Sequence, residues 1–418
     1  MWRADGYRAI FRYRAFRAFW LSFTVSALGD AMTRVALIWL VYTTTRSAFA
    51  LGALLLCYTG PVIAGGWLAG WLLDRFDRRS VMLVDNAIRG VVVAAIPVAY
   101  ALGVRALWPL YAVAAVYGFL YMITLAGSPA LIPALVPERQ LATANALETL
   151  TYTLSGVIGP PVAGLLIVVV GAPNVLALDA VSYACFALAL IGMCGSAAAT
   201  AATDGAVGRG GGIAEAVALV WSHPVLLSTT LMFMAFNVGE GFLAVWLPIY
   251  ADRGLGGGPE LYGLLLAALA VGEVSGALLA GSATFPLPLG VLICGAQALA
   301  GASLGLLLFG PALVWTLPGL FLLGAFSAPL TIWAQTLRMR IIPERLRGRT
   351  FALLRTLMQG SGPLASAAAG VLLPALGVAT MIGCSALLVG VPGLIGYRVR
   401  ALRAGASTQT TPEVKAAV

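Results

Sequence analysis

Lysine and histidine are almost absent from the sequence, and charged residues of any kind are scarce. Charged residues make up 10% of the 418 residues, and the chain has one histidine. Its single lysine, Lys415, lies close to the C-terminus, so the chain has no phosphate-binding loop of the kind that requires a lysine. One histidine, His223, cannot by itself build a metal site or a catalytic triad. These absences argue against ATP hydrolysis and against an enzyme.

Cysteine is also uncommon. The five cysteines lie inside apolar segments, and no two of them have the spacing of a metal site. Cysteines in such surroundings behave as small apolar residues and are expected to pack in a core. We therefore expect neither a metal ion nor a cofactor.

Apolar residues, in contrast, dominate the chain. Hydrophobic residues make up 61% of it and the mean hydropathy is +0.95, far above the values of soluble proteins. A helix needs about 20 apolar residues to cross a bilayer, and twelve segments reach that length. They are residues 16–43, 48–73, 80–102, 107–135, 141–170, 174–196, 225–251, 260–281, 287–309, 311–338, 346–375 and 378–397. The sequence thus predicts an all-α polytopic membrane protein with twelve transmembrane helices.

The arginines gather on one side of the predicted membrane. Five lie in the first 17 residues, three in residues 75–79 and six in residues 338–355, whereas Arg46, Arg105 and Arg253 fall on the other side. Because loops rich in arginine stay in the cytoplasm, we predict a cell inner membrane protein with both termini cytoplasmic. The bilayer accounts for the net charge of +9, and no folded basic face points to nucleic acid.

An internal repeat divides the chain into two halves. Residues 136–139 (Val-Pro-Glu-Arg) return at residues 342–345 as Ile-Pro-Glu-Arg, and Gly29-Asp30 returns as Gly239-Glu240. Two parallel repeats of six helices place a substrate site at the midplane between them. The predicted units are a six-helix half (1–196), a cytoplasmic linker (197–224), a second six-helix half (225–400) and a disordered tail (401–418).

The loop after the second segment combines a glycine, aspartates and arginines, in the order Gly70-Trp-Leu-Leu-Asp74-Arg75-Phe-Asp77-Arg78-Arg79. Gly70 is expected to let two helices approach closely, and Asp74 to lie against the positive end of a neighbouring helix. The arginines are expected to hold the loop at the inner membrane face. We predict that this loop is part of an inner gate, formed by Gly70, Asp74, Arg75, Arg78, Arg79, Asp85, Arg89 and Glu148.

This loop resembles the signature between the second and third helices of the major facilitator superfamily of secondary transporters, although Asp77 replaces a glycine. Residues 19–42, 135–146 and 345–349 resemble the exporter branch that includes enterobactin and macrolide efflux proteins. In the fifth segment, the residues that resemble a signature linked to export by antiport are Gly156, Gly159, Pro160, Pro161 and Gly164. The resemblance implies a monomer that works by alternating access and exchanges a small molecule for protons. The basic residue that many drug-proton antiporters carry in the fourth helix is missing from residues 107–135.

Ionisable side chains inside the bilayer are costly, so each is a candidate functional residue. Asp30 and Arg34 lie one helical turn apart and can neutralise each other, either for transport or as a structural pair. Glu240 and Glu273 have no basic residue within a turn, which fits a proton carrier or an anchor for a cationic substrate. We expect transport and proton coupling to involve these four residues.

Four further charged residues inside the apolar segments have other expected roles. Asp85 and Arg89 are four residues apart and are expected to brace the Asp74 loop. Glu148 is expected to join the arginines of residues 338–355 in the inner gate. Asp179 is expected to reach interfacial water.

Aromatic and amide residues on the first, fourth, seventh and tenth segments are expected to line a cavity for a large amphiphilic ligand. They are Phe23, Trp39, Tyr117, Tyr121, Asn237, Trp246, Trp333 and Gln335. The predicted function is export of a drug, siderophore or secondary metabolite. Uptake or facilitated transport of a lipid or nutrient by the same fold, and a receptor that transports nothing, remain open.

Overall fold

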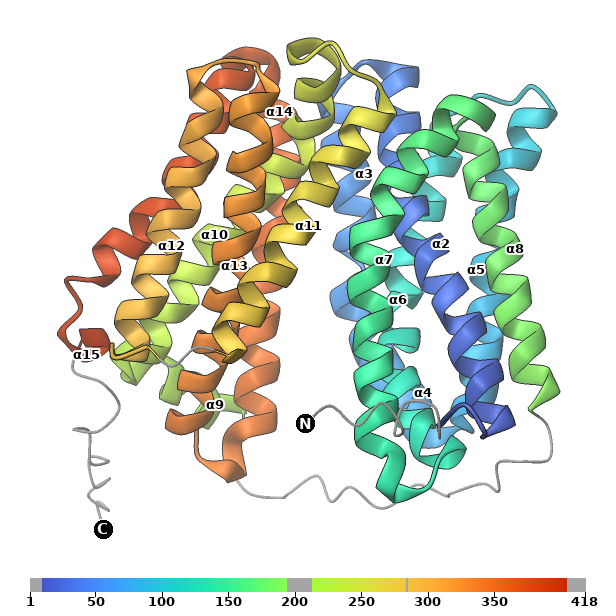
Figure 1. The fold of residues 1–418 in the computed structure, drawn as a ribbon, viewed down its shortest axis with the longest axis horizontal. Coiled ribbons are helices and arrows are strands. Elements are labelled where there is room, and N and C mark those ends of the chain that lie inside the picture. The colour runs from blue at the N-terminus through green and yellow to red at the C-terminus, as the bar shows by residue number, and fades with distance from the viewer. Residues whose placement is uncertain (1–9, 194–212, 283–284, 404–418) are drawn as a thin grey trace.

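The computed structural model describes residues 10–193, 213–282 and 285–403, and every regular element in these ranges is a helix (Figure 1). The N-terminal half contains α2 (Arg14–Thr45), α3 (Ala48–Thr59), α4 (Val62–Arg75), α5 (Arg78–Ala101), α6 (Trp108–Leu135), η1 (Glu138–Gln140), α7 (Leu141–Val170) and α8 (Ala172–Gly192). A short helix, α9 (Ile213–Ser222), precedes the C-terminal half. That half contains α10 (Pro224–Ile249), η2 (Tyr250–Gly254), α11 (Pro259–Ser282), α12 (Leu289–Gly305), η3 (Leu306–Phe309), α13 (Leu313–Ile341), η4 (Glu344–Leu346), α14 (Arg347–Gly396) and α15 (Arg400–Arg403). Residues 197–212 of the predicted linker and residues 404–418 of the predicted tail lie outside the described ranges.

Eleven helical segments of the described ranges are long and apolar enough to cross a membrane. One of them, α14, has 50 residues, more than one crossing needs. Its backbone leaves the helical conformation at Gly377, where φ is +75° and ψ is 163°, a region that favours glycine. The break divides α14 into residues 347–376 and 378–396, which match the last two predicted segments. The predicted all-helical architecture with twelve crossings is therefore confirmed.

The second predicted segment, residues 48–73, is built from two helices, α3 and α4. Gly60 and Pro61 separate them, and Pro61 has no N–H group with which to continue the hydrogen bonds of α3. Tyr58, Thr59 and Val62 beside this break line the central cavity described below.

Two helical bundles lie side by side in Figure 1, with α2 to α8 in one and α10 to α14 in the other. The bundles meet where α3 packs on α14 and where α7 packs on α11. Gly52 of α3 lies so close to α14 that an added Cβ would be 2.5 Å from the carbonyl oxygen of Ser366. Gly263 of α11 lies against the carbonyl of Pro160 in α7. Small residues permit such close contact between helices in a membrane.

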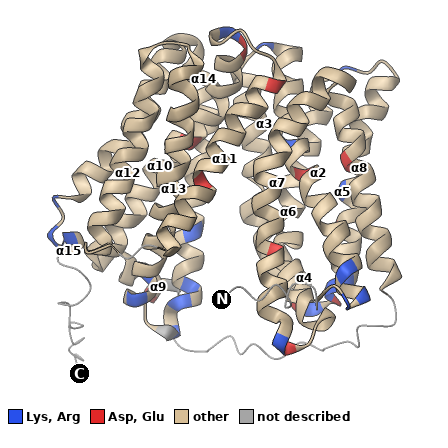
Figure 2. Ribbon diagram, viewed as in Figure 1, with Lys and Arg blue, Asp and Glu red and all other residues tan. Residues whose placement is uncertain are grey.

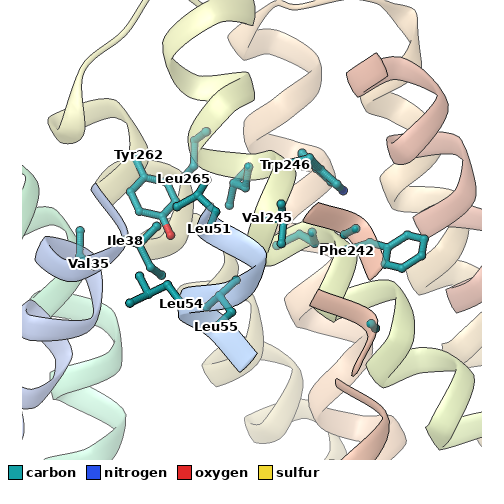
Figure 3. Packing of buried hydrophobic residues seen from close by; sticks show 14 of the residues in the cluster. Val35, Ile38, Leu51, Leu54, Leu55, Phe242, Val245, Trp246, Tyr262 and Leu265 are labelled. Atoms are coloured by element: carbon teal, nitrogen blue, oxygen red, sulfur yellow. The ribbon is translucent and has the colours of Figure 1, made fainter. Parts of the chain in front are cut away.

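Apolar side chains from both halves share one core. Figure 3 shows Tyr262 and Leu265 of α11 beside Ile38 of α2 and Leu51 of α3. Leu51 and Leu265 are both fully buried. This core joins the halves near the ends of α2 and α10. We call this the opposite end of the molecule, because it lies opposite the arginine-rich end described next.

The arginines gather at the other end, called here the basic end, which contains the loops after α4, α6 and α13 (Figure 2). Arg78 donates a hydrogen bond to the carbonyl of Ala130 in α6 (2.8 Å), and Arg79 donates one to the carbonyl of Leu190 in α8 (2.5 Å). Both carbonyls lie near helix C-termini, where cations are favourable. The two arginines therefore tie the start of α5 to the ends of α6 and α8.

Asp77, which replaces the glycine of the signature, begins α5. Its carboxylate accepts hydrogen bonds from the backbone N–H (2.9 Å) and the hydroxyl (2.8 Å) of Ser80. Asp77 is thus an N-cap that holds the turn in the way expected of an aspartate at this position.

The expected close helix approach at Gly70 is wrong for this conformation, because nothing lies within 4 Å of a Cβ added there. The close approaches within the N-terminal half occur elsewhere. Gly65 of α4 lies against the backbone of Phe119, and Gly118 of α6 lies against the carbonyl of Tyr58. Gly70 extends into open space instead, beside the exposed residues of the loop.

Replacing Gly118 with leucine is expected to lower the free energy of unfolding by about 1–3 kcal/mol, because the new side chain must push α3 away from α6. Replacing Gly70 with leucine is the matched control, and its effect is expected to stay within about 0.5 kcal/mol. Thermal unfolding of the purified protein in detergent micelles measures both. Equal destabilisation by the two variants would contradict the packing at Gly118.

Candidate functional site: a central cavity between the halves

A cavity of about 470 Å³ lies between the two halves at the middle of their helices. Residues of α2, α3, α4, α6 and α7 line it from the N-terminal half, and residues of α10 and α14 line it from the C-terminal half. Its polar and aromatic residues are Asp30, Arg34, Tyr58, Thr59, Tyr117, Tyr121, Tyr152, Ser155, Asn237, Glu240, Gln359 and Ser366. Such a mixed surface suits a ligand with both apolar and polar groups.

Polar and aromatic contacts close the cavity toward the opposite end. Asp252, in η2, accepts hydrogen bonds from Arg46 (2.5 Å) and from the hydroxyl of Tyr42 (2.5 Å). Trp39 stacks on Tyr262 with 6.2 Å between the ring centroids. Since Tyr42 lies in the last turn of α2, Arg46 follows that helix and Asp252 follows α10, these contacts join the two halves.

The predicted gate residues at the basic end do not join the halves in this conformation. Asp74 is exposed and makes none of the described hydrogen bonds or ion pairs, so its expected contact with a helix end is not formed here. Arg75 lies over the ring of Trp71, 6.0 Å from its centroid. Glu148 is 8% exposed on α7 and is in no ion pair with the described residues. The ribbons of the two bundles diverge toward this end (Figure 1).

The expected ion pair between Asp30 and Arg34 is wrong. Arg34 extends into the cavity and forms no ion pair with the described residues. Asp30 instead faces α5 and α8, where its Oδ1 lies 3.5 Å from an Arg89 nitrogen and accepts a hydrogen bond from the Tyr183 hydroxyl. The one-turn spacing along α2 therefore predicted the wrong partner.

Arg89 is the centre of a buried polar network. It donates to Asp85 (2.7 Å), to the Thr124 hydroxyl (2.5 Å) and to the Tyr183 hydroxyl (3.2 Å). The Thr124 hydroxyl donates in turn to Asp85 (2.7 Å). Asp85 and Arg89 are each 1% exposed, so the expectation that they brace the Asp74 loop is wrong. Seven to eleven residues into α5, at about 1.5 Å per residue, they reach the depth of Asp30 and link α2, α5, α6 and α8.

Asp179 of α8 belongs to the same buried region, and the expectation that it reaches interfacial water is wrong. Its exposed fraction is 0%. It accepts hydrogen bonds from the hydroxyls of Thr33 (2.6 Å) and Ser182 (2.8 Å). Gly29 makes room for it, because a Cβ on Gly29 would overlap the carboxylate. The sequence features that match this buried position are Gly29, which leaves space for the carboxylate, and Ser182, which donates to it.

Two carboxylates face the cavity system from the C-terminal half. Glu240 of α10 lines the central cavity and also a second one of about 430 Å³ between α10, α11 and α13. Glu273 of α11 lines the second cavity, and Asn237 lines both. Neither carboxylate is in an ion pair with the described residues. The central cavity therefore has Asp30 and Arg34 on the wall of the N-terminal half and Glu240 on the facing wall, with Glu273 in the adjoining second cavity.

The residues of the fifth-segment signature lie on two surfaces of α7. Gly156 lines the cavity. Gly159 packs against Ala31 of α2, and Gly164 packs against the backbone of Pro259 and Glu260 at the start of α11. The helix continues through Pro160 and Pro161 to Val170. The signature thus forms contacts both within the N-terminal half and across to the other half.

Three of the eight aromatic and amide residues expected in the cavity lie on its wall: Tyr117, Tyr121 and Asn237. The other five lie elsewhere, so that part of the prediction is corrected. Phe23 packs against Phe19, Tyr152 and Phe186, Trp39 packs on Tyr42 and Tyr262, Trp246 donates to Ser385 (3.1 Å), Trp333 contacts Phe285, and Gln335 is exposed outside the cavity.

The cavity also contains aromatic and amide residues that sequence reasoning missed. Tyr58, Tyr152 and Gln359 lie on α3, α7 and α14. The position of Tyr58 beside the Gly60-Pro61 break was the available signal, since a helix break exposes neighbouring side chains. Tyr152 and Gln359 had no such signal, because the residues of a uniformly apolar helix do not indicate which of its sides faces the cavity.

The model of the transmembrane secretion effector family matches residues 6–416, nearly the whole chain. This chain belongs to that family of the major facilitator superfamily. The predicted resemblance to major facilitator exporters is thereby confirmed, and the protein is a multi-pass membrane transporter rather than an enzyme.

Curated members of the superfamily are similar over most of their length. The multidrug efflux pump Tap of Mycolicibacterium fortuitum is 27% identical over 390 residues, which cover 90% of this chain and 93% of Tap. The Tap pump of Mycobacterium tuberculosis is 28% identical over 403 residues (91% and 92%). The enterobactin exporter EntS of Escherichia coli is 25% identical over 409 residues (96% and 95%).

Solved structures share the fold of this transporter. A crystal structure of the peptide transporter POT aligns with a TM-score of 0.72 at 14% identity, over 94% of this chain and 95% of that one. A bacterial homologue of the lysosomal transporter Spinster, solved in an inward-facing and occupied conformation, aligns with a TM-score of 0.68 at 15% identity (94% and 97%). These likenesses concern the fold alone.

Proposed function

We propose that this transporter exports amphiphilic small molecules, such as drugs, siderophores or secondary metabolites, from the cytoplasm. The observation that carries the proposal is the central cavity, which both halves line with aromatic, amide and charged side chains. Four tyrosines give it apolar faces with hydroxyl edges, a surface that accepts ligands of several shapes. The names of its relatives, a multidrug efflux pump and an enterobactin exporter, support the direction of transport.

The orientation follows from the arginines. Loops rich in arginine remain in the cytoplasm, so the basic end is assigned to the cytoplasm and the opposite end to the outside of the inner membrane. In this orientation the Arg46, Tyr42 and Asp252 contacts close the cavity toward the outside. This is the conformation in which an exporter takes up its substrate.

Export then requires alternating access, in which the bundles rock about the cavity and close at the cytoplasmic end. The loop of Asp74 and the arginines 75–79 is the proposed gate, together with Glu148 of α7. Arg355 is the ninth residue of α14, and Glu148 is the eighth residue of α7. The two side chains of opposite charge thus start at similar depths on facing halves, and closure is expected to bring them together.

Proton antiport is the proposed source of energy. A membrane potential supplies about 2.3 kcal/mol per charge for every 100 mV. Asp30 lines the cavity and also contacts the buried Arg89 network, so it is assigned to the proton pathway. Glu240 and Glu273 are assigned to the positive charge of a substrate, with Arg34 opposite them. The transporter is proposed to work as a monomer.

The test is accumulation of dyes, antibiotics and catecholate siderophores in an efflux-deficient bacterium that expresses the chain. Lower accumulation of some compound, reversed by a protonophore, is the expected result. A chain that moves compounds inward would point to uptake instead. A purified chain that binds compounds in proteoliposomes without moving any would point to a receptor.

Replacing Asp74 with asparagine is expected to slow export about tenfold or more, because closure at the cytoplasmic end loses a charged contact. Binding of the compound to the purified protein is expected to change little, since Asp74 lies outside the cavity. Efflux rates and equilibrium binding separate the two effects. Glu138→Gln, at an exposed carboxylate of the same membrane face, is the matched control. Parallel loss of binding and transport in Asp74→Asn would contradict the gate role.

A further inference from the structure

We propose that the fully buried carboxylate of Asp179 is a proton-binding site of the N-terminal half, linked to the central cavity through Thr33 and Asp30. The proposal rests on the proposed proton-driven export and names a residue for its proton. Asp179 lies behind the cavity wall rather than on it. It would therefore hold a proton without competing with the substrate for space.

The charges around Asp179 do not balance when all groups are ionised. The charged and titratable groups of the surrounding helices are Asp30 and Arg34 on α2, Asp85 and Arg89 on α5, Tyr117 on α6 and Tyr183 on α8. The guanidinium of Arg89 lies within 4 Å of two carboxylates, at 2.7 Å from Asp85 and 3.5 Å from Asp30. Arg34 points into the cavity. Three carboxylates thus share one buried arginine.

Asp179 is the carboxylate without a cation. Its two oxygens accept hydrogen bonds from neutral hydroxyls, those of Ser182 and Thr33, and no ion pair joins it to a described residue. A buried, unpaired carboxylate is very unfavourable, so such a group takes up a proton. A proton on Asp179 removes its negative charge, so that Arg89 then faces only the two carboxylates that it contacts, Asp30 and Asp85.

Three buried polar atoms of this cluster, including Nε of Arg89, have no hydrogen-bond partner among the described residues. The hydroxyl of Tyr117 is buried and has no hydrogen-bond partner among the described residues. Its ring lies 5.7 Å from the Arg89 guanidinium. Oδ1 of Asp85 is likewise unpartnered. Native proteins leave few buried polar atoms unsatisfied, so these atoms mark a place for an added proton or its carrier water.

Hydroxyl groups contact both carboxylates of the proposed route from the cavity. Asp30 lines the cavity and its side chain is 17% exposed. Thr33, one turn further along α2, donates to Asp179, and Tyr183, next to Ser182 on α8, donates to Asp30. In the proposed first step a hydronium ion in the cavity loses a proton to Asp30: an O–H bond of hydronium breaks, an O–H bond forms at Asp30, and water remains. In the second step the O–H bond at Asp30 breaks, an O–H bond forms at a carboxylate oxygen of Asp179, and the hydroxyl of Thr33 turns to accept from it.

Infrared spectroscopy of the purified full chain tests the site without a substrate. A protonated carboxylic acid has a carbonyl stretching band that its ionised form lacks. We expect spectra of the native chain, recorded from about pH 5 to about pH 9, to keep part of this band above the pH at which ordinary carboxylic acids have ionised. That part of the band is expected to be absent from the spectra of Asp179→Asn. Asp74→Asn removes an exposed carboxylate and is the control in which the band remains. An unchanged band in Asp179→Asn would overturn the proposal.

A second variant keeps the test decisive if Asp179→Asn does not fold. Thr33→Val has the same shape and removes one hydrogen bond to Asp179, so it is expected to change the pH at which the band titrates. A titration identical to that of the native chain would overturn the proposal. Because neither experiment needs transport, failure of the export hypothesis leaves both readable.

Transport measurements then test the coupling. With any compound that the accumulation panel identifies, Asp179→Asn is expected to bind it normally and to lose the response of its export to an imposed pH gradient. Export by Asp179→Asn that still follows the gradient would also overturn the proposal.

Discussion

Replacing Arg89 with alanine is expected to lower the free energy of unfolding by about 3–5 kcal/mol, the cost of leaving a buried partner charge without compensation. Arg89 is 1% exposed and donates to Asp85, which has a side chain that is fully buried. The substitution leaves Asp30, Asp85 and Asp179 together with no cation between them. We expect a chain that reaches the membrane in small amounts and unfolds early on heating in detergent.

Two further variants define the cause of this loss. Arg105→Ala removes an exposed arginine just after α5 and is expected to leave stability within about 0.5 kcal/mol. The double variant Asp85→Asn with Arg89→Gln removes the cation together with its nearest carboxylate. It is expected to be more stable than Arg89→Ala, because one uncompensated charge fewer is buried. A stable Arg89→Ala chain would contradict the central role of this network.

The sequence was sufficient to predict the helices, since twelve apolar segments match the structure and the last two meet at Gly377. The number of apolar residues that a crossing helix needs depends only on the thickness of the bilayer. The turn at Asp77 and the break before Val62 depend on residues that are close in the sequence. Gly60-Pro61, for example, is a local signal for the helix break. What these local rules could not supply was the partner of any buried side chain.

Asp30 illustrates that limit. The spacing of four residues made Arg34 its expected partner, but helices α5 and α8 pack against α2 and bring Arg89 and Tyr183 to it. In a uniformly apolar helix, no alternation of polar and apolar residues indicates which side faces the cavity. Trp39 and Trp246 were for that reason expected in the cavity and are found in the core. Asp179 was expected near water for the same reason.

Replacing Glu240 with glutamine is expected to reduce export of a permanently cationic dye by about tenfold to about a hundredfold, the range of typical coupling energies between sites. Glu240 lines both cavities, and Glu273 shares the second one with it. Both face cavities between apolar helices, where an unpaired negative charge attracts a cation more strongly than in bulk water. Glutamine keeps the shape and removes the charge. Efflux from preloaded cells measures the rate.

A neutral dye of similar size separates recognition of charge from a general loss of transport. We expect Glu240→Gln to export the neutral dye at nearly the native rate, whereas Asp30→Asn, on the proposed proton pathway, loses export of both dyes. Glu260→Gln, at an exposed carboxylate at the start of α11, is the matched control, since it alters charge in the same half but outside both cavities. If Glu240→Gln slows both dyes equally, Glu240 acts in the transport cycle itself, and the division between a proton pathway in one half and a cation site in the other is wrong.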